Sequence, residues 1–191
     1  MNNALYLFVG KSGSGKSTIA DILENKHGYN VVESYTTRCP RYHGERGHIF
    51  LSNAEYNELQ DIVASTEYNG NKYCATKQML DECKIYPIDI PGIKVLLERY
   101  TSRSIVIVYF DTNVRTRIDR MIDRGDSDTA IVSRLYADEE FDWEKALSKL
   151  VWNYKNNMNR DVEMYVINAN VELEEVLSQV KHHLKVTEED V

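Results

Sequence analysis

Residues 5–17 read LYLFVGKSGSGKS, and this stretch decides the fold. Its first five residues are a short apolar run of the kind that forms a buried strand. Residues 10–17 fit the pattern GxxxxGK[ST], and residues 18–26 carry apolar side chains at helical spacing before Gly28 ends the helix. A glycine-rich loop between a strand and a helix can turn successive backbone N–H groups toward one anion. The stretch therefore predicts a phosphate-binding loop in an α/β fold.

The residue types of this loop indicate binding of ATP or GTP. Lys16 can reach the terminal phosphates, and the Ser17 hydroxyl can ligate Mg²⁺. A Gly/Ser loop that only turns the chain is the alternative, and the full octapeptide between a strand and a helix argues against it. We expect the nucleotide to contact Ser12, Gly13, Ser14, Gly15, Lys16, Ser17 and Thr18.

The rest of the chain alternates strands with helices, which is typical of a largely parallel sheet covered by helices. Further strands are predicted at residues 31–32, 85–90, 104–110 and 164–167. Helices are predicted at 52–60, 76–83, 91–99, 113–124, about 128–140, 144–156 and 171–184. Residues 34–47 read as a loop, and residues 62–74 predict a hairpin that turns at Asn69-Gly70. Because residues 34–83 interrupt the alternation, we expect them to form a small inserted lobe.

Composition narrows the class of protein. The chain has 191 residues, 42% of them hydrophobic, which suits one domain with a real core. Its longest apolar run, residues 105–110, is far shorter than the ~20 residues that span a bilayer. Cys39, Cys74 and Cys83 form no CxxC pair, so we expect free thiols and a cytoplasmic location.

The charge distribution favours small anionic ligands. A net charge of −7 argues against a general nucleic-acid binder. Three of the eleven arginines nevertheless lie in residues 38–46, and five lie in residues 115–134. Arg38 and Arg41 stand in a loop that Pro40 keeps from being helical, and two guanidiniums beside hydroxyl groups make a good cradle for a phosphate. A pair of surface arginines in a mobile loop is the alternative.

The motifs, taken in order, resemble those of the guanylate kinase family. They are the phosphate loop, Thr36-Thr37-Arg38-x-Pro40-Arg41, Gly44-Glu45, Gly70-Asn71-x-Tyr73, Ile88-Asp89-Ile90-x-Gly92 and Arg124-Gly125. The resemblance covers roughly residues 4–184 and implies a P-loop NTPase fold, with a parallel sheet flanked by helices, a small inserted α+β lobe and a helical lid. It implies a single domain with its core at 1–33, 84–119 and 141–184, a nucleoside-monophosphate-binding lobe at 34–83 and the lid at 120–140.

The resemblance also implies ATP-dependent phosphoryl transfer to a nucleoside monophosphate, foremost GMP to GDP, with ATP and Mg²⁺ as cofactors. The residues that would bind the acceptor are Ser34, Arg38, Arg41, His48, Tyr73 and Asp89. The catalytic residues would be Lys16, Arg38, Arg120, Arg124 and Arg134, and Asn168 would lie beside the adenine. We expect only small-molecule nucleotides as partners, with no nucleic acid and no membrane, and a monomer or homodimer.

Two neighbouring arginines, Arg115 and Arg117, are expected to lie on a solvated helix face and pair with acidic neighbours. The apolar side chains of the same helix, at positions 114, 118, 121 and 122, share the opposite face.

The sequence does not determine which base the acceptor nucleotide carries. The family usually has a tyrosine at the place of His48, and Ala64 and Ala75 stand where it has side chains that hydrogen-bond to guanine. Glu67 or Thr76 could substitute after a small shift in register. The same chemistry on another nucleotide or on a ribose bisphosphate-type sugar phosphate is one alternative. A guanylate kinase-like binding module without turnover is the other.

Overall fold

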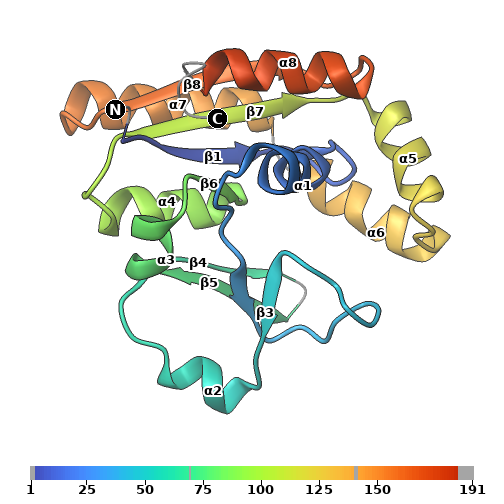
Figure 1. The fold of residues 1–191 in the computed structure, drawn as a ribbon, viewed down its shortest axis with the longest axis horizontal. Helices are drawn as coiled ribbons and strands as arrows, with labels where there is room; N and C mark the ends of the chain where they lie inside the picture. The colour runs from blue at the N-terminus through green and yellow to red at the C-terminus, as the bar shows by residue number, and fades with distance from the viewer. Residues whose placement is uncertain (1–2, 69, 140–141, 185–191) are drawn as a thin grey trace.

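A computed structural model describes residues 3–68, 70–139 and 142–184. Its central sheet has four parallel strands in the order β6-β1-β7-β8 (Figure 1). These strands are β1 (Leu5–Val9), β6 (Ile85–Pro87), β7 (Ile105–Asp111) and β8 (Val162–Asn168). The β1 strand is buried along its whole length, as expected for a parallel sheet with both faces covered.

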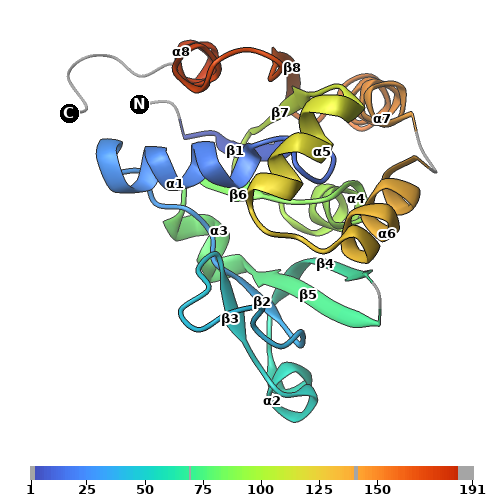
Figure 2. The ribbon, with the colours of Figure 1, turned by 90° about the vertical axis from the view of Figure 1, so that its right-hand side faces the viewer.

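Helices cover both faces of this sheet (Figure 2). Successive side chains of β1 point to opposite faces and so belong to two separate parts of the core. Leu5, Leu7 and Val9 pack toward α4 (Ile90–Arg99) and α7 (Trp143–Asn157). Tyr6 and Phe8 pack toward α1 (Lys16–His27) and α8 (Leu173–His183). The sheet thus provides a rigid base from whose carboxyl edge the loops of the site project.

A second sheet, in the order β3-β2-β5-β4, lies below the central one in Figure 1. Its strands are β2 (Ser34–Thr36), β3 (His48–Phe50), β4 (Ile62–Tyr68) and β5 (Asn71–Thr76). Two short helices accompany it, α2 (Asn53–Glu58) and α3 (Lys77–Glu82). Val63, Ala64 and Ala75 of this sheet join the core cluster that holds Ile93 and Leu96 of α4, so the second sheet rests on the central domain.

Two further helices, α5 (Val114–Asp123) and α6 (Asp128–Glu139), stand beside the carboxyl end of the central sheet (Figure 1). The Asn113 side chain caps α5 by accepting a hydrogen bond from the Thr116 N–H. These two helices bring the arginine-rich stretch of the sequence to the edge where the phosphate loop lies.

The α/β fold with a parallel sheet flanked by helices confirms the predicted fold class. The hairpin is confirmed, and so is the helix after Ser52, where Ser52 and Glu55 form a capping box. Residues 69 and 140, which fall within predicted elements, and residue 141, which falls between two of them, lie outside the described residues. No helix of the described residues is long and apolar enough to cross a bilayer, and all three cysteines are free thiols.

The structure differs from the strands predicted at 31–32 and 85–90 and from the loop predicted at 34–47. Val31 makes only an isolated bridge to Ile85, and the strand forms instead at Ser34–Thr36, inside the predicted loop. The parallel partner of β2 is β3, which begins at His48, directly after the predicted loop. The strand predicted at 85–90 ends at Pro87, since the Asp89 carboxylate accepts the Gly92 N–H at 2.8 Å and so starts α4.

Candidate active site

The phosphate loop joins β1 to α1, as the sequence predicts. Gly13 and Gly15 take left-handed conformations with φ of 76° and 90°, and Gly15 is the residue that caps α1. Glycine adopts this region without the steric cost that a Cβ brings. A Cβ at Gly13 would also lie 2.6 Å from the backbone oxygen of Arg117. The loop is therefore shaped by its own glycines and by close packing against α5.

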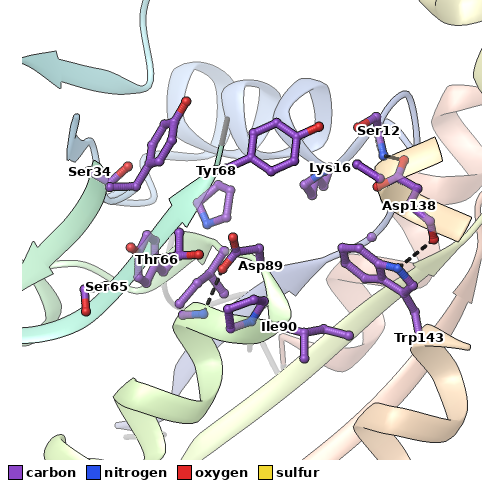
Figure 3. Close-up of a pocket in the computed structure, with 18 of the residues that line it drawn as sticks. Ser12, Lys16, Ser34, Ser65, Thr66, Tyr68, Asp89, Ile90, Asp138 and Trp143 are labelled. Carbon is purple, nitrogen blue, oxygen red and sulfur yellow. Dashed lines mark hydrogen bonds between the residues drawn. The ribbon is translucent and has the colours of Figure 1, made fainter. Parts of the chain in front are cut away.

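Two cavities meet at this loop. One, of about 470 Å³, lies between the loop, the second sheet and the start of α4. The other, of about 760 Å³, lies between the loop, α5, α6 and the segment before α8. The residues that line both cavities are Ser12, Lys16, Ser17 and His48. A group held at Lys16 could therefore be reached from either side, and Figure 3 shows Lys16 at the rim of the first cavity.

Lys16 is the cation at this junction. Its Nζ donates to the Lys11 backbone oxygen at 3.4 Å. Burial lowers the pKa of Lys16 to about 8, and the nearby Arg124 acts in the same direction while Asp138 opposes it. An anion beside Lys16 would replace the lost hydration and favour the charged form.

Arg38 and Arg41 converge on one carboxylate, that of Glu45. Arg38 donates two hydrogen bonds to it, at 2.8 and 3.0 Å, and the Arg41 N–H and guanidinium donate at 2.6 and 3.3 Å. Burial alone would raise the pKa of Glu45, but these hydrogen bonds outweigh it and hold the pKa below its usual range. The sequence motif thus does gather two guanidiniums around one anionic group, and that group belongs to the protein itself.

The two arginines differ in where they lie. Arg41 lines the larger cavity, whereas Arg38 is directed at Glu45 and over the Phe50 ring, 5.3 Å from its centroid, and lines neither cavity. Arg38 needs a change of its side chain, or of the loop that carries Glu45, before it can contact a ligand in either cavity.

Ser34, His48 and Tyr73 come together at the edge of the smaller cavity. Ser34 Oγ and His48 Nδ1 share a hydrogen bond at 2.9 Å, and the Tyr73 ring meets the His48 ring edge-on. Burial and the charge of Arg38 lower the pKa of His48, which favours a neutral ring at pH 7. When Nδ1 accepts from Ser34, the other ring nitrogen keeps its proton and can donate to a phosphate oxygen.

The far end of the smaller cavity is lined by Asp89, Thr66, Glu67 and Tyr86. Burial raises the pKa of Asp89, although hydrogen bonds from Gly92 and Thr66 oppose the shift. Ala64 and Ala75 are fully buried in the core and do not line the cavity, and Thr76 does not line it either. Of the two substitutes that the sequence suggests for the base contacts, only Glu67 lines the cavity, and the preceding residue, Thr66, lines it as well.

The three arginines predicted to act from the lid line the larger cavity. Arg124 binds Asp126 through two hydrogen bonds, and Arg134 lies 3.7 Å from the same carboxylate. The hydrogen bond from Arg124 is the main reason that the pKa of Asp126 is lowered. Arg120 is held differently, because its guanidinium donates to the backbone oxygens of Ser14 and Ala169 at 3.2 and 2.9 Å.

Arg117 does not lie where the sequence analysis expects it. Only 2% of its surface is exposed, and it donates to Asp138 of α6 at 3.0 Å, whereas Arg115 is exposed and pairs with Asp119 as predicted. Val114 and Ile122, predicted on the apolar face of α5, are half-exposed. Arg117 and Met121 are four residues apart and so share one helix face, and this is the face that α5 buries.

Two residues of the site were missed by the sequence analysis, Asp138 and Trp143. The Asp138 carboxylate accepts the Ser12 N–H at 2.8 Å, and the Trp143 indole donates to the Asp138 backbone oxygen at 3.1 Å. Asp138 and the buried Ile131 are seven residues apart on α6 and so share a face, which is the one sequence signal that could have placed Asp138 inside.

Asn168, predicted beside the adenine, ends β8, and its side chain accepts hydrogen bonds from Asn170. Part of the lining of the larger cavity comes instead from the four residues that follow Ala169, residues 170–173. Asn168 thus supports this segment from behind.

A divalent cation would find its protein ligand in Ser17, the first serine of α1. The described residues contain no group of three or more acidic, histidine or cysteine side chains that could hold a metal ion. Mg²⁺ often binds through one protein group together with substrate phosphates and water, so this donor set fits Mg²⁺ carried in by a nucleotide.

Comparisons with known proteins agree with this geometry. The chain matches no protein-family model. It is 25% identical over 165 residues to a guanylate kinase of Fusobacterium nucleatum, covering 78% of this chain and 88% of that one. It is 31% identical over 133 residues to a guanylate kinase of Clostridium tetani, covering 63% of each chain.

Among solved structures, the guanylate kinase of Anaplasma phagocytophilum shares the fold. Its TM-score is 0.51 at 17% sequence identity, over 96% of this chain and 85% of that one. The sequence relatives, this shared fold and the motifs that surround the two cavities lead to one conclusion: the chain resembles the guanylate kinases in sequence and shares their fold.

Proposed function

We propose that the protein transfers the γ-phosphoryl group of ATP to GMP and releases ADP and GDP. Its similarity to two guanylate kinases supports an enzyme of the nucleoside monophosphate kinase class. The observation that carries the proposal is that two cavities meet at Lys16, one lined by the phosphate loop and arginines, the other by Ser34, Tyr73 and Asp89. ATP would occupy the larger cavity and GMP the smaller one.

Catalysis in this arrangement consists of positioning and charge neutralisation. The phosphoryl group in transfer carries charge on its oxygens, and Lys16 with the arginines of α5 and α6 lies where it can stabilise that charge. No general base is required, since the acceptor phosphate oxygen is already anionic near neutral pH. Mg²⁺, held at Ser17, would neutralise phosphate charge.

Glu45 and Asp126 act as internal counter-ions in this proposal. Each holds two arginines in the ligand-free protein, Glu45 in the lobe at residues 34–83 and Asp126 in the lid at residues 120–140. The acceptor phosphate would draw Arg38 and Arg41 toward itself, and the phosphates of ATP would draw Arg124 and Arg134. Both segments would then close over the substrates and exclude water, which prevents loss of the phosphoryl group by hydrolysis.

A second acceptor class has one observation in its favour. Ala64 and Ala75 are buried in the core, so neither can contact a base, and the base end of the cavity depends on Asp89, Thr66 and Glu67. Discrimination between bases requires paired polar groups, so another nucleotide or a sugar phosphate stays the alternative acceptor.

Assays with a panel of acceptors test whether GMP or another compound is the substrate. Diphosphate formation from GMP, AMP, CMP, UMP and ribose 1,5-bisphosphate should be measured by chromatography with saturating MgATP. We expect the highest kcat/KM with GMP. A higher kcat/KM with another acceptor would make that compound the substrate. If none of the acceptors gives a product, the remaining interpretation is a binding module without turnover.

Removing Arg41 should weaken the acceptor site, since Arg41 lines the larger cavity together with Lys16 and His48, which also line the acceptor cavity. Loss of a charge-assisted hydrogen bond predicts that Arg41→Ala raises the KM for GMP roughly 10- to 100-fold. The matched control is Arg46→Ala in the same loop, because Arg46 pairs with Glu24 of α1 and lines neither cavity. Steady-state kinetics with varied GMP would show it, and an unchanged KM in Arg41→Ala would contradict this role.

ATP affinity should fall as the pH rises above 8. The pKa of Lys16 is lowered to about 8 in the free protein, and a bound phosphate raises it. The contribution of Lys16 to ATP affinity is therefore fully present below pH 8 and is lost as the pH rises above 8. Between pH 7 and pH 9 the dissociation constant of MgATP should rise about tenfold. Lys16→Arg should remove this dependence, since a guanidinium does not titrate in that range. Titration calorimetry at several pH values measures it, and a flat profile in the wild type would refute the assignment.

A further inference from the structure

Three successive residues of the phosphate loop are held from outside by α5 and α6. The Asp138 carboxylate accepts the Ser12 N–H at 2.8 Å, and the backbone of Arg117 leaves no room for a Cβ at Gly13. Arg120 donates to the Ser14 backbone oxygen at 3.2 Å. The loop is thus not shaped by its glycines alone, because two helices that are distant in sequence fix its outer side.

The Arg117–Asp138 pair is the buried part of this contact. Their side chains are 2% and 9% exposed, and the Asp138 oxygen that binds Arg117 is the same one that binds Ser12. The Arg117 Nε is buried and finds no hydrogen-bond partner within the described part of the chain. Apolar side chains of similar volume often stabilise a protein as well as such a pair does, so the pair is poorly explained by stability alone.

Asp138 also stands at a position that a carboxylate would ordinarily avoid. It lines the cavity assigned to the acceptor and lies beside the loop assigned to ATP, so its negative charge faces two polyanionic substrates. Arg117 neutralises that charge from behind. The Asp138 carboxylate can thus accept the Ser12 N–H. The charge of Arg117 meanwhile offsets most of the repulsion between this carboxylate and the substrate phosphates.

The same stretch forms a wall of the acceptor cavity. Trp143 donates its indole N–H to the Asp138 backbone oxygen (Figure 3). Trp143 and Ala137 both line the cavity. A shift of Asp138 would therefore move both the phosphate loop and the indole.

We propose that Arg117 and Asp138 are positioning residues, which hold the first half of the phosphate loop in its nucleotide-binding shape through the Ser12 N–H. The proposal rests on the proposed function, since it takes a nucleoside triphosphate as the ligand of the loop. Asp138 supplies the hydrogen-bond acceptor, and Arg117 supplies the charge that makes a carboxylate tolerable at this place.

Two double variants isolate the hydrogen bond. Arg117→Leu/Asp138→Asn keeps an oxygen that can accept from Ser12 but removes both charges, and Arg117→Leu/Asp138→Leu has nearly the same shape without that oxygen. Arg117→Leu alone leaves the carboxylate unpaired beside the phosphates. The control is Arg115→Leu, because Arg115 is on the same helix and its ion pair with Asp119 is exposed.

The dissociation constant of MgADP should be measured by titration calorimetry, with Tm recorded for every variant. We expect the Asn double variant to bind within about threefold of the wild type and the Leu double variant about tenfold more weakly, although both melt near the wild type. Arg117→Leu alone should bind most weakly, and Arg115→Leu should be unchanged. In turnover assays the Leu double variant should raise the KM for ATP more than the KM for GMP, because the backbone oxygen of residue 138 that binds the Trp143 indole is retained.

Equal affinity of the two double variants would overturn the positioning role and leave a merely structural ion pair. If the Leu double variant does not fold, the Asn double variant is compared with Arg117→Leu instead. Equal affinity of these two variants for MgADP would overturn the proposal. A wild-type protein that binds no MgADP would instead overturn the proposed function, and this inference with it.

Discussion

Replacing Lys16 with alanine should lower the kcat for GDP formation about 1,000-fold. Lys16 lines both cavities and is the cation at the point where they meet, so its loss removes charge stabilisation where the transferred group passes. Loss of one such fixed electrostatic contact typically costs 100- to 1,000-fold in rate, and the compact charge of a lysine on two phosphates belongs at the upper end. Initial rates with saturating MgATP and GMP measure the effect.

The stability of this variant should not fall. Burial lowers the pKa of Lys16 to about 8, which means that the charged side chain is held at a cost in the ligand-free protein. We therefore expect the Tm of Lys16→Ala to equal or exceed that of the wild type. Lys26→Ala, at the exposed end of the same helix, is the control for both rate and Tm. A Lys16→Ala protein with more than a tenth of the wild-type kcat would exclude Lys16 from catalysis.

The second large effect is expected for Gly13→Ala. A Cβ at this position meets the Arg117 backbone oxygen at 2.6 Å, and the φ of 76° is unfavourable for alanine. The backbone strain costs about 1–2 kcal/mol. The steric overlap costs a further ~1–3 kcal/mol, because the opposing atom belongs to a helix backbone and cannot rotate away. The loop should shift as a result, and MgATP binding should weaken more than about 100-fold.

Gly28→Ala is the matched control for this variant. Gly28 has a φ of 68°, and a Cβ there would meet no atom within 4 Å. It should lose only the strain contribution, about 1–2 kcal/mol in the free energy of unfolding, and bind MgATP normally. Urea unfolding and calorimetry of the two variants separate strain from overlap. Equal losses of stability and unchanged binding in both would show that the contact between the loop and α5 does not matter.

The features that the sequence predicted well are those that depend on a few local residues. The phosphate loop is recognised from a strand, three glycines and a helix start, all within residues 5–28, so its place in the chain can be predicted from adjacent residues. The capping box at Ser52 and the hairpin near Gly70 are local in the same sense. Long buried strands such as β7 are unambiguous because their apolar run is continuous.

The features that it predicted poorly depend on distant partners. The β2 strand pairs with β3 and β5, and its three residues carry too little periodicity to be recognised. The orientation of α5 was misjudged because a buried arginine is acceptable only with its counter-ion, and Asp138 is 21 residues away on another helix. The pairing of Arg38 with Glu45 could likewise not be read from either residue alone.

Transfer of label from ATP carrying a radioactive γ-phosphate tests the central claim most directly. The wild-type protein would be incubated with this ATP, Mg²⁺ and GMP, and the products separated by chromatography. A phosphoryl group that passes between the two cavities at Lys16 should appear in GDP, with ADP formed in equal amount and little labelled inorganic phosphate. Label that stays in ATP, or that leaves only as inorganic phosphate while GMP is unchanged, would contradict the account.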